Sequence, residues 1–402
     1  MRKVNLDDYV PYVEEGVLLE VERLGERLKG LKVLHINSTA VGGGVAEILR
    51  FLVPAMASVG LVVRWPVIKG PDEFFRFTKS IHNGLHGKPV EVGEEGAEVY
   101  RRTAAENAGI LEEDADFTVI HDQQPLGLVS YRRGRGRWIW YCHVDPTFCT
   151  RQVWNFLAPM AGRCDLAVFH LPAYAADLPV LQYFMPPAID PLSEKNREVP
   201  DEEYRRVLDE LGVDPGGPPV ILQVSRYDRL KDPVGVIRAF RLVRRKMECR
   251  LILAGGRADD DPEGDAVLEE VEREAGGDKD ISVLMLKPDA DLEINVLQRR
   301  ADVVVQKSLR EGFGLTVTEA LWKGKPVVAT PTGGLAAQVV HRVTGLCGRT
   351  EEEVASHIET LLQDPGLARE LGSAGKRLVQ KRYIVPVYLR NWLKMLALLA
   401  GL

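Results

Sequence analysis

The sequence has few cysteines, no long apolar run and no excess of positive charge. Its five cysteines are scattered and include no Cys-x-x-Cys pair, which fits neither a disulfide framework nor a zinc site. Nowhere do eighteen apolar residues follow one another, and the first residues lack the apolar segment of a signal peptide. We therefore expect a protein of the reducing cytoplasm, with no membrane partner and no metal site.

Negative charge outweighs positive charge, and amide side chains are scarce. The formal net charge is -6, which argues against a protein that holds nucleic acid through its overall field. The chain has only 8 Asn and 10 Gln beside abundant Glu, Arg and Lys, a bias reported for proteins of thermophiles. Hydrophobic residues make up 45% of the 402 positions, so the chain can bury real cores, and its length predicts more than one domain.

Strand and helix patterns alternate along most of the chain. Residues 6–30 have the apolar spacing of an amphipathic helical extension. Short β-rich runs then predict ten strands, at 32–37, 61–65, 117–121, 138–144, 166–170, 220–225, 250–254, 282–286, 302–306 and 326–330. A proline-rich segment at 185–191 separates the two groups of five. The pattern predicts an α/β fold with two doubly wound parallel sheets, in domains 1–190 and 191–384, and a terminal helix within 385–402 that packs back on the first domain.

In open parallel sheets, ligands bind at the carboxyl ends of the strands. In the first domain a glycine turn at 42–44 follows one predicted strand, while His121 with Asp122 and His143 with Asp145 follow two others. One strand of the second domain leads into a glycine-containing loop and a helix, and another leads into a basic loop at 225–233. These loops are the candidate binding segments.

The glycine-containing loop of the second domain has the pattern of a phosphate site. Gly312 and Gly314 let the backbone approach a ligand closely, and the N–H groups at the helix start, near Leu315 and Thr316, point toward an anion. The alternative is a capping box, in which Thr316 and Glu319 satisfy the helix start by themselves. These residues leave both interpretations open.

The basic loop allows two interpretations as well. Arg226 and Lys231 flank a loop at the carboxyl edge of the sheet, where a guanidinium and an ammonium could neutralise a diphosphate. Alternatively, the loop is merely exposed and its charges pair with Asp228 and Asp232.

Together these motifs resemble the retaining glycosyltransferases of the GT-B fold, a family that includes sucrose-phosphate, glycogen and trehalose synthases. The signature is Glu-Gly-Phe-Gly-Leu-Thr-Val-Thr-Glu-Ala, with seven residues between Glu311 and Glu319, followed by Gly324 and by Gly333 and Gly334. The resemblance implies two Rossmann-like domains that face a central cleft.

The resemblance also implies roles for single residues on the donor side. Glu311 would contact the hydroxyls of the donor sugar, Glu319 the ribose, and Arg226 and Lys231 the diphosphate, which the glycine turn also faces. The base pocket is expected near Lys287. The expected nucleotide-sugar contacts are therefore Gly43, Gly44, Arg226, Lys231, Lys287, Gly312, Phe313, Gly314, Leu315, Thr316 and Glu319.

Two segments of the first domain extend the resemblance. Residues 120–127 look like the His-Asp segment that contacts sugars in trehalose phosphate synthases. Residues 141–146 resemble the segment that supplies the active-site histidine, here His143. The resemblance is closest to the trehalose glycosyl-transferring synthases and trehalose phosphorylases. It implies sugar contacts at Asp122, Gln123, His143, Asp145 and Glu311.

The implied reaction moves glucose from UDP-, ADP- or GDP-glucose to free glucose and forms trehalose, reversibly and with retention. His143, Glu311, Arg226 and Lys231 would be the catalytic residues. No tightly bound cofactor is expected, Mg²⁺ could accompany the nucleotide without a predicted protein site, and a homodimer stays open. A free acceptor is favoured because the candidate acceptor loops contain no Arg or Lys, although Lys69 lies nearby in the sequence.

Several alternatives share these motifs. A trehalose phosphorylase would use free phosphate, a sucrose-phosphate or trehalose-phosphate synthase would accept a phosphosugar, and a sensor would bind a nucleotide sugar without catalysis. A nucleotide-dependent dehydrogenase is disfavoured because the 42–44 turn lacks Gly-x-Gly-x-x-Gly spacing.

Overall fold

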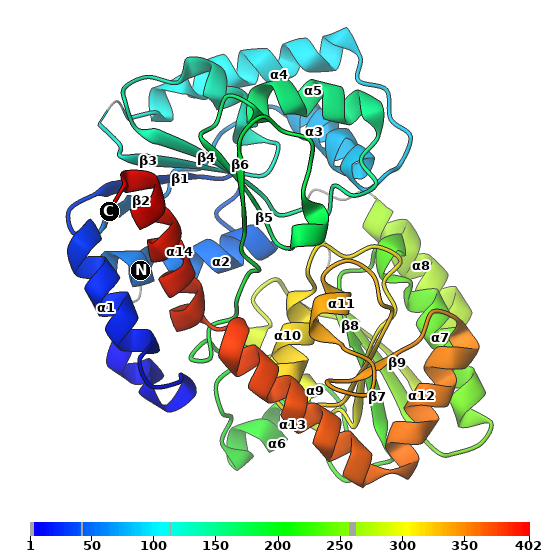
Figure 1. Ribbon diagram of the computed structural model, residues 1–402. Coiled ribbons are helices and arrows are strands. Elements are labelled where there is room, and N and C mark those ends of the chain that lie inside the picture. The colour runs from blue at the N-terminus through cyan, green and yellow to red at the C-terminus, as the bar shows by residue number, and fades with distance from the viewer. Residues whose placement is uncertain (1–3, 42, 113, 257–262) are drawn as a thin grey trace. The chain divides into compact units, whose positions relative to one another are not determined.

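A computed structural model describes residues 4–41, 43–112, 114–256 and 263–402. The chain divides into two compact units (Figure 1). Unit 1 comprises Met1–Pro187 and Val385–Leu402, and unit 2 comprises Ala188–Ile384. Each unit contains one parallel sheet of six strands with helices on both faces, which confirms the predicted fold class.

The sheet of unit 1 has the strand order β2-β1-β3-β4-β5-β6, and all of its strands run parallel. Its inner strands are nearly continuous apolar runs because helices cover both faces. The strands are β1 (Lys32–Ile36), β2 (Val62–Arg64), β3 (Phe117–His121), β4 (Arg137–Cys142), β5 (Leu166–Phe169) and β6 (Leu181–Phe184). The helices include α2 (Gly44–Ser58), α3 (Asp72–Leu85), α4 (Glu94–Asn107) and α5 (Arg151–Ala161), with 3₁₀ turns at Leu6–Tyr12, Ala108–Ile110, Pro125–Tyr131 and Pro172–Tyr174.

The first and last helices of the chain pack together in unit 1. α1 (Val17–Leu28) lies along α14 (Val385–Ala400), which also contacts α2 (Figure 1, blue beside red). Val21 and Leu28 are fully buried on the inner side of α1. The amphipathic extension at the N-terminus is therefore a covering layer over the C-terminal helix.

The sheet of unit 2 has the order β12-β11-β10-β7-β8-β9 and is also parallel. Its strands are β7 (Val220–Val224), β8 (Arg250–Gly255), β9 (Ile281–Met285), β10 (Val303–Gln306), β11 (Val327–Ala329) and β12 (Leu346–Cys347). Its helices are α6 (Asp201–Glu210), α7 (Pro233–Arg244), α8 (Glu263–Ala275), α9 (Asp291–Arg300), α10 (Leu315–Trp322), α11 (Leu335–Gln338), α12 (Glu351–Gln363) and α13 (Pro365–Arg382), with a 3₁₀ turn at Arg229–Lys231.

Each sheet contains one edge strand that the sequence patterns do not predict. β6 lies at an edge and leaves Leu181 68% exposed, and β12 is only two residues long. Neither has the buried β-rich run on which strand prediction depends. The helices α3 and α4 were also unpredicted.

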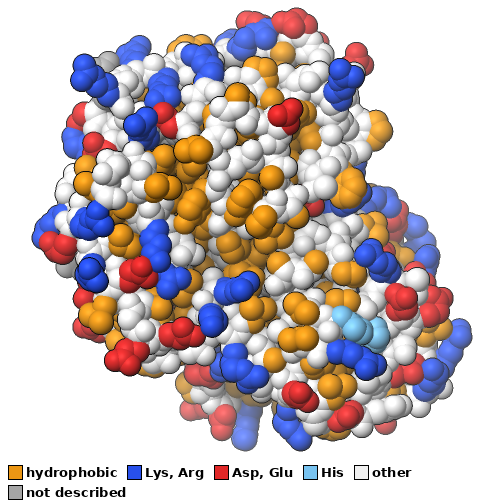
Figure 2. Space-filling model, in the orientation of Figure 1, with side chains coloured by type: hydrophobic (Ala, Val, Ile, Leu, Met, Phe, Trp, Pro, Cys, Tyr) orange, Lys and Arg blue, Asp and Glu red, His pale blue; other side chains and the backbone are white. Residues whose placement is uncertain are grey.

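The surface is mixed in charge. Figure 2 shows Lys and Arg interspersed with Asp and Glu over the visible face. Within the described parts of the chain, no helix is both long enough and apolar enough to span a bilayer.

We predict that Trp392→Ala destabilises unit 1 by about 3–5 kcal/mol, because it removes a large, fully buried side chain of α14. Calorimetry of thermal unfolding measures the effect as a lower midpoint of the unit 1 transition. Leu398→Ala, on the same helix but at a 65% exposed position, serves as the control and should change stability by less than about 0.5 kcal/mol. Equal effects of the two substitutions would contradict this account of α14.

Candidate functional site

The glycine-containing loop of unit 2 joins β10 to α10. Gly314 is the N-cap residue, with a φ of 88°, and no side chain caps the start of the helix. Thr316 lies inside the first turn, so the capping-box interpretation of Thr316 and Glu319 is wrong. The N–H groups of Val317 and Thr318 donate to the Gly314 oxygen at 3.0 Å and 3.3 Å, so those of Leu315 and Thr316 are the ones that a ligand or solvent can bind. Gly334 packs so tightly that a Cβ there would lie 2.3 Å from Cα of Phe313.

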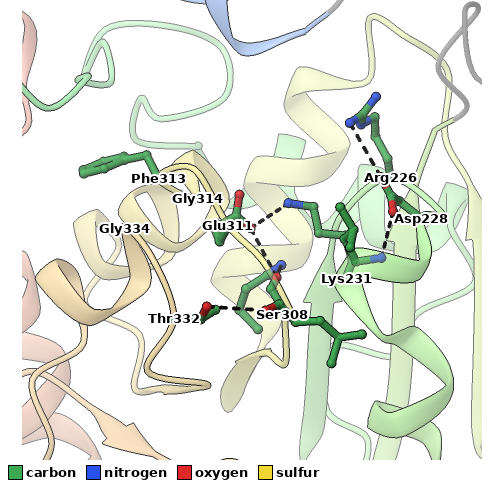
Figure 3. Close-up of polar contacts among 12 residues, drawn as sticks. Arg226, Asp228, Lys231, Ser308, Glu311, Phe313, Gly314, Thr332 and Gly334 are labelled. Carbon is green, nitrogen blue, oxygen red and sulfur yellow. Dashed lines mark hydrogen bonds and ion pairs between the residues drawn. The ribbon is translucent and has the colours of Figure 1, made fainter. Parts of the chain in front are cut away.

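Lys231 and Glu311 form an ion pair at this loop (Figure 3). Lys231 Nζ lies 2.6 Å from Glu311 Oε2, and the Ser308 hydroxyl donates to the same oxygen at 3.2 Å. The side chains are 18% and 10% exposed, so the pair is shielded from bulk water. Gln223 Nε2 donates to the backbone oxygen of Lys231 at 2.9 Å and fixes the basic loop to β7. Two residues predicted from separate motifs thus meet in one place.

Arg226 is more accessible than Lys231. It is 47% exposed, and a carboxylate oxygen of Asp228 lies 3.9 Å from its guanidinium (Figure 3). Asp228 also accepts the Leu230 N–H at 2.8 Å, while Asp232 pairs with Lys307. The alternative, in which the charges of the loop pair with Asp228 and Asp232, is therefore confirmed for Asp228, which forms a long ion pair with Arg226, and wrong for Asp232, which pairs with Lys307 outside the loop.

Glu319 is buried below the loop on α10. Gln298 Nε2 donates to its carboxylate at 3.4 Å, and Lys195 Nζ lies 3.9 Å from the other oxygen. Lys323 donates to Gln298 Oε1 at 2.8 Å, and burial lowers the pKa of Lys323 to about 7, although Glu319 opposes this shift. Sequence reasoning missed three residues around Glu319. The packing of α9 on α10 brings Gln298 there, Lys195 comes from the segment before α6, and Lys323 follows α10 four residues after Glu319.

Other predicted donor residues lie around this loop. The Phe313 side chain is buried, with its ring 5.2 Å from the ring of Tyr383, so only its backbone could contact a ligand. The Phe313 carbonyl already accepts from Gln338 Nε2 at 2.6 Å. Gly312 and Leu315 are half-buried beside it, and Lys287 is exposed after β9.

The glycine turn of unit 1 leads directly into α2. Gly43 has a φ of 76°, is exposed and is the N-cap residue, with no side-chain cap. Gly44 begins the helix, so the turn presents helical N–H groups at the carboxyl edge of the sheet, as an anion site requires. Gly42 lies outside the described residues.

Four histidines, which we call the histidine chain, form a hydrogen-bonded line in unit 1. His35 Nδ1 lies 2.9 Å from His121 Nε2, His121 Nδ1 lies 2.9 Å from His143 Nε2, and His143 Nδ1 lies 3.1 Å from His170 Nε2. His143 is half-buried, while the other three are buried. His35 and His170 were not predicted as site residues.

Strand register accounts for the histidine chain. His35 pairs with Val119 of β3, so His121 lies two residues farther along on the same face. His121 pairs in turn with Tyr141 of β4, and His143 again lies two residues farther along. The Tyr141 ring stacks on His143 with a centroid separation of 3.9 Å. The histidine chain therefore runs obliquely across the carboxyl edge of the sheet.

Burial favours the uncharged form of His35, His121 and His143. Desolvation lowers the pKa of His35 to about 3 and lowers those of His121 and His143 well below their usual value. The neighbouring imidazoles lower the pKa of His121 and His143 further. Among the described residues, no three His, Cys, Asp or Glu side chains converge as metal ligands, and a line of rings does not surround a point.

Asp122 is held in a strained backbone conformation beside the histidine chain. Its φ is 62°. Its carboxylate accepts the backbone N–H of His143 at 2.7 Å, and its backbone oxygen accepts from Trp140 Nε1 at 3.0 Å. Burial raises the pKa of Asp122 to about 7, and the hydrogen bond from His143 only partly opposes this. A non-glycine residue in this region of φ is often found at functional sites.

The two other predicted sugar-binding residues of unit 1 are also buried. The Gln123 side chain points toward α3, where its Nε2 lies 3.5 Å from the Thr78 oxygen. Asp145 accepts the Thr147 N–H at 2.9 Å and so shapes the loop after β4. Both are placed to support the loops that carry Asp122 and His143.

The comparisons with known proteins fit this architecture. Residues 35–176 match the family "Trehalose synthase, N-terminal domain", and residues 209–378 match "Glycosyl transferases group 1". The solved sucrose-phosphate synthase from Thermosynechococcus elongatus superposes with a TM-score of 0.68 at 19% identity, over 92% of this chain and 97% of that one. Fold and family matches together define a group 1 glycosyltransferase with the GT-B fold.

Sequence relatives identify the family within this class. A trehalose synthase from Pyrococcus horikoshii is 40% identical over 407 residues, which cover 99% of this chain and 97% of the relative. A trehalose phosphorylase from Grifola frondosa is 28% identical, over 90% of this chain and 57% of its own length. The chain belongs to the trehalose synthase family of glycosyltransferases.

We predict that Asp122→Asn stabilises the folded protein relative to wild type, and that it does so more at higher pH. The pKa of Asp122 is about 7 in the folded protein and about 4 in the unfolded chain. Between these two pH values the folded wild type holds a proton that the unfolded chain has released, so the stability of the wild type falls as the pH rises. Asn keeps an acceptor oxygen for the backbone N–H of His143 and tolerates a positive φ.

Differential scanning calorimetry checks this prediction. The melting temperature of the variant relative to wild type should be higher at a pH of about 7.5 than at about 4.5. The same difference at both values would show that Asp122 has an ordinary pKa in the folded protein.

Proposed function

We propose that this protein transfers glucose from a nucleoside diphosphate glucose to free glucose and forms trehalose, reversibly and with retention of configuration. The observation that carries the proposal is the cationic site at the start of α10, where Lys231 meets Glu311 and Arg226 stays half-exposed beside them. The match to trehalose synthases over nearly the whole chain supports it.

On the donor side, the diphosphate would bind Arg226, Lys231 and the N–H groups at the start of α10. These groups are oriented before the reaction, so they would stabilise charge on the leaving diphosphate by roughly 3 kcal/mol for each well-placed donor. Glu311 would accept from hydroxyls of the donor glucose, held in place by its 2.6 Å contact with Lys231. Glu319 would accept from the ribose, and Gly43 and Gly44 would present further N–H groups to the diphosphate.

The proposed transfer breaks the bond between the anomeric carbon and the phosphate oxygen and forms a bond from that carbon to the anomeric oxygen of the acceptor. The departing phosphate oxygen takes the proton of the acceptor hydroxyl, on the same face of the sugar. A glycosidase-type pair of carboxylates fits poorly, since Glu311 is paired with Lys231 and Glu319 is buried against Gln298. His143 would orient the donor glucose, with Asp122, Gln123 and Asp145 as further sugar or loop residues.

A neutral acceptor suits the carboxyl edge of unit 1. The proposed sugar contacts at this edge are His143, whose pKa burial lowers, Asp122, whose pKa burial raises, the amide of Gln123, and Asp145. Lys69, the nearby cation in the sequence, is exposed, and Asn107 binds its backbone N–H and oxygen at 2.8 Å and 2.6 Å. A phosphosugar would call for cations where hydroxyl-binding groups stand.

The second candidate is a trehalose phosphorylase, which the likeness to the Grifola frondosa enzyme favours. It would use the same cationic site for free phosphate instead of a diphosphate.

We predict that Arg226→Ala, Lys231→Ala and Glu319→Ala each weaken nucleoside diphosphate binding. A charged hydrogen bond contributes about 1.5–3 kcal/mol, so the loss should be roughly tenfold or more. Isothermal calorimetry with UDP, ADP and GDP measures it. Arg229→Ala is the matched control, because Arg229 stands in the same loop but pairs with Glu270 at 2.7 Å. Wild-type affinity in all three variants would exclude this donor site.

We also predict that free glucose is the better acceptor. Initial rates with UDP-, ADP- and GDP-glucose should be much higher with glucose than with glucose 6-phosphate. A preference for glucose 6-phosphate would indicate a phosphosugar-accepting synthase. Release of glucose 1-phosphate from trehalose and free phosphate would indicate a phosphorylase, and nucleotide-sugar binding without product would indicate a sensor.

A further inference from the structure

Two buried glutamines lie behind the ion pair of Lys231 and Glu311. Gln223 on β7 and Gln306 on β10 are each 1% exposed, and these two strands pair with each other in the sheet of unit 2. Gln223 Nε2 donates to the backbone oxygen of Lys231 at 2.9 Å, and Gln306 Nε2 donates to the Ser308 hydroxyl at 2.9 Å. Each partner of the ion pair is therefore connected, through hydrogen bonds, to a strand of the sheet.

The hydrogen bonds between Gln306 and Glu311 have only one possible direction. Glu311 Oε2 accepts from the Lys231 ammonium at 2.6 Å, and an ionised carboxylate has no proton to donate. The Ser308 hydroxyl lies 3.2 Å from the same oxygen, so it must donate to it. Because a hydroxyl has a single proton, Ser308 can then only accept from Gln306, whose amide nitrogen faces it. The carboxylate at one end thus fixes the direction of both hydrogen bonds.

We propose that Ser308 and Gln306 are positioning residues for Glu311. The amide of Gln306 turns the Ser308 hydroxyl toward Glu311, and this hydroxyl fixes the orientation in which the carboxylate meets a hydroxyl of the donor sugar. The inference rests on the proposed function, in which Glu311 accepts from the donor glucose. It adds the two residues that set the orientation of that carboxylate, neither of which is among the site residues expected from the sequence.

Two contacts on one oxygen restrict the rotation of the Glu311 carboxylate. Lys231 and Ser308 both reach Oε2, from different loops, and the other carboxylate oxygen points away from both of them (Figure 3). The long, flexible side chain of Lys231 could follow a rotating carboxylate, whereas the short, buried side chain of Ser308 cannot. A carboxylate that is oriented before the sugar binds loses less conformational entropy on binding. The Ser308 hydroxyl therefore contributes to sugar binding without touching the sugar.

The backbone at Ser308 is held independently of its hydroxyl. The Thr330 hydroxyl donates to the backbone oxygen of Ser308 at 2.6 Å, and the N–H of Leu309 donates to the backbone oxygen of Leu230 at 2.7 Å. Both contacts remain when Ser308 is replaced by Ala. This substitution therefore tests the hydroxyl and leaves the loop in place.

Isothermal calorimetry with two ligands separates the sugar contact from the rest of the donor site. The ligands are whichever of UDP, ADP and GDP binds the wild type most tightly, and the corresponding nucleoside diphosphate glucose. Ser308→Ala should weaken binding of the nucleotide sugar about three- to tenfold and change the affinity for the nucleoside diphosphate by less than about twofold. An equal loss for both ligands, or no loss for either, would overturn the proposal.

A second variant tests the role of Gln306. Gln306→Met has a side chain of similar length but no N–H to donate, so it should reproduce the selective loss of affinity for the nucleotide sugar. The control is Thr360→Ala, which removes an exposed hydroxyl of α12 that donates to the Ser356 oxygen at 2.8 Å, and it should bind both ligands as the wild type does. Wild-type affinity for the nucleotide sugar in Gln306→Met would exclude Gln306 as a positioning residue.

A double-mutant cycle shows whether Ser308 acts through Glu311. In a Glu311→Ala background no carboxylate is left to orient, so the further substitution Ser308→Ala should change the affinity for the nucleotide sugar by less than about twofold. If the two substitutions are additive, Ser308 acts independently of Glu311 and the proposal is wrong.

The outcomes distinguish this inference from the proposed function. If the selective loss appears but no trehalose forms, the proposed function fails and the positioning role stands. If trehalose forms while Ser308→Ala binds the nucleotide sugar as the wild type does, the positioning role fails and the function stands. If the wild type binds no nucleoside diphosphate glucose, both are wrong.

Discussion

Parallel strand pairing is the constraint on which the rest of this structure depends. Because β1, β3, β4 and β5 run in the same direction, residues that follow them all lie at one edge of the unit 1 sheet. The same rule brings the loops after β7 and β10 together in unit 2, where Leu309 N–H binds the Leu230 oxygen at 2.7 Å. Groups far apart in the sequence become neighbours because the strands that they follow pair with one another.

Within unit 2, that constraint produces a shielded ion pair. Removing charges from water is expensive, and Lys231 and Glu311 compensate for it through their 2.6 Å contact and the Ser308 hydroxyl. Both charges are therefore fixed in orientation before a ligand arrives. In unit 1 the chemistry is the opposite: burial favours the neutral form of His35, His121 and His143 and raises the pKa of Asp122, so the edge binds through hydrogen bonds.

The sequence allowed the fold class and the loops that carry chemistry to be predicted, because buried strands and the Glu311–Glu319 motif are local patterns. It could not predict the partners of those residues. The ion pair of Lys231 with Glu311 was not predicted, and the capping box considered as an alternative at Thr316 is absent because α10 begins at Leu315. His35 and His170 join His143 only through strand register, which no single segment contains.

The central claim is that one glucosyl unit moves from a nucleotide to free glucose with its configuration kept. The most direct measurement is ¹³C NMR of the product formed from nucleoside diphosphate glucose labelled at the anomeric carbon of its α-linked glucose. The account predicts that the label appears in α,α-linked trehalose at the same rate as the nucleoside diphosphate is released. Label in a β-linked product, or in free glucose alone, would contradict it.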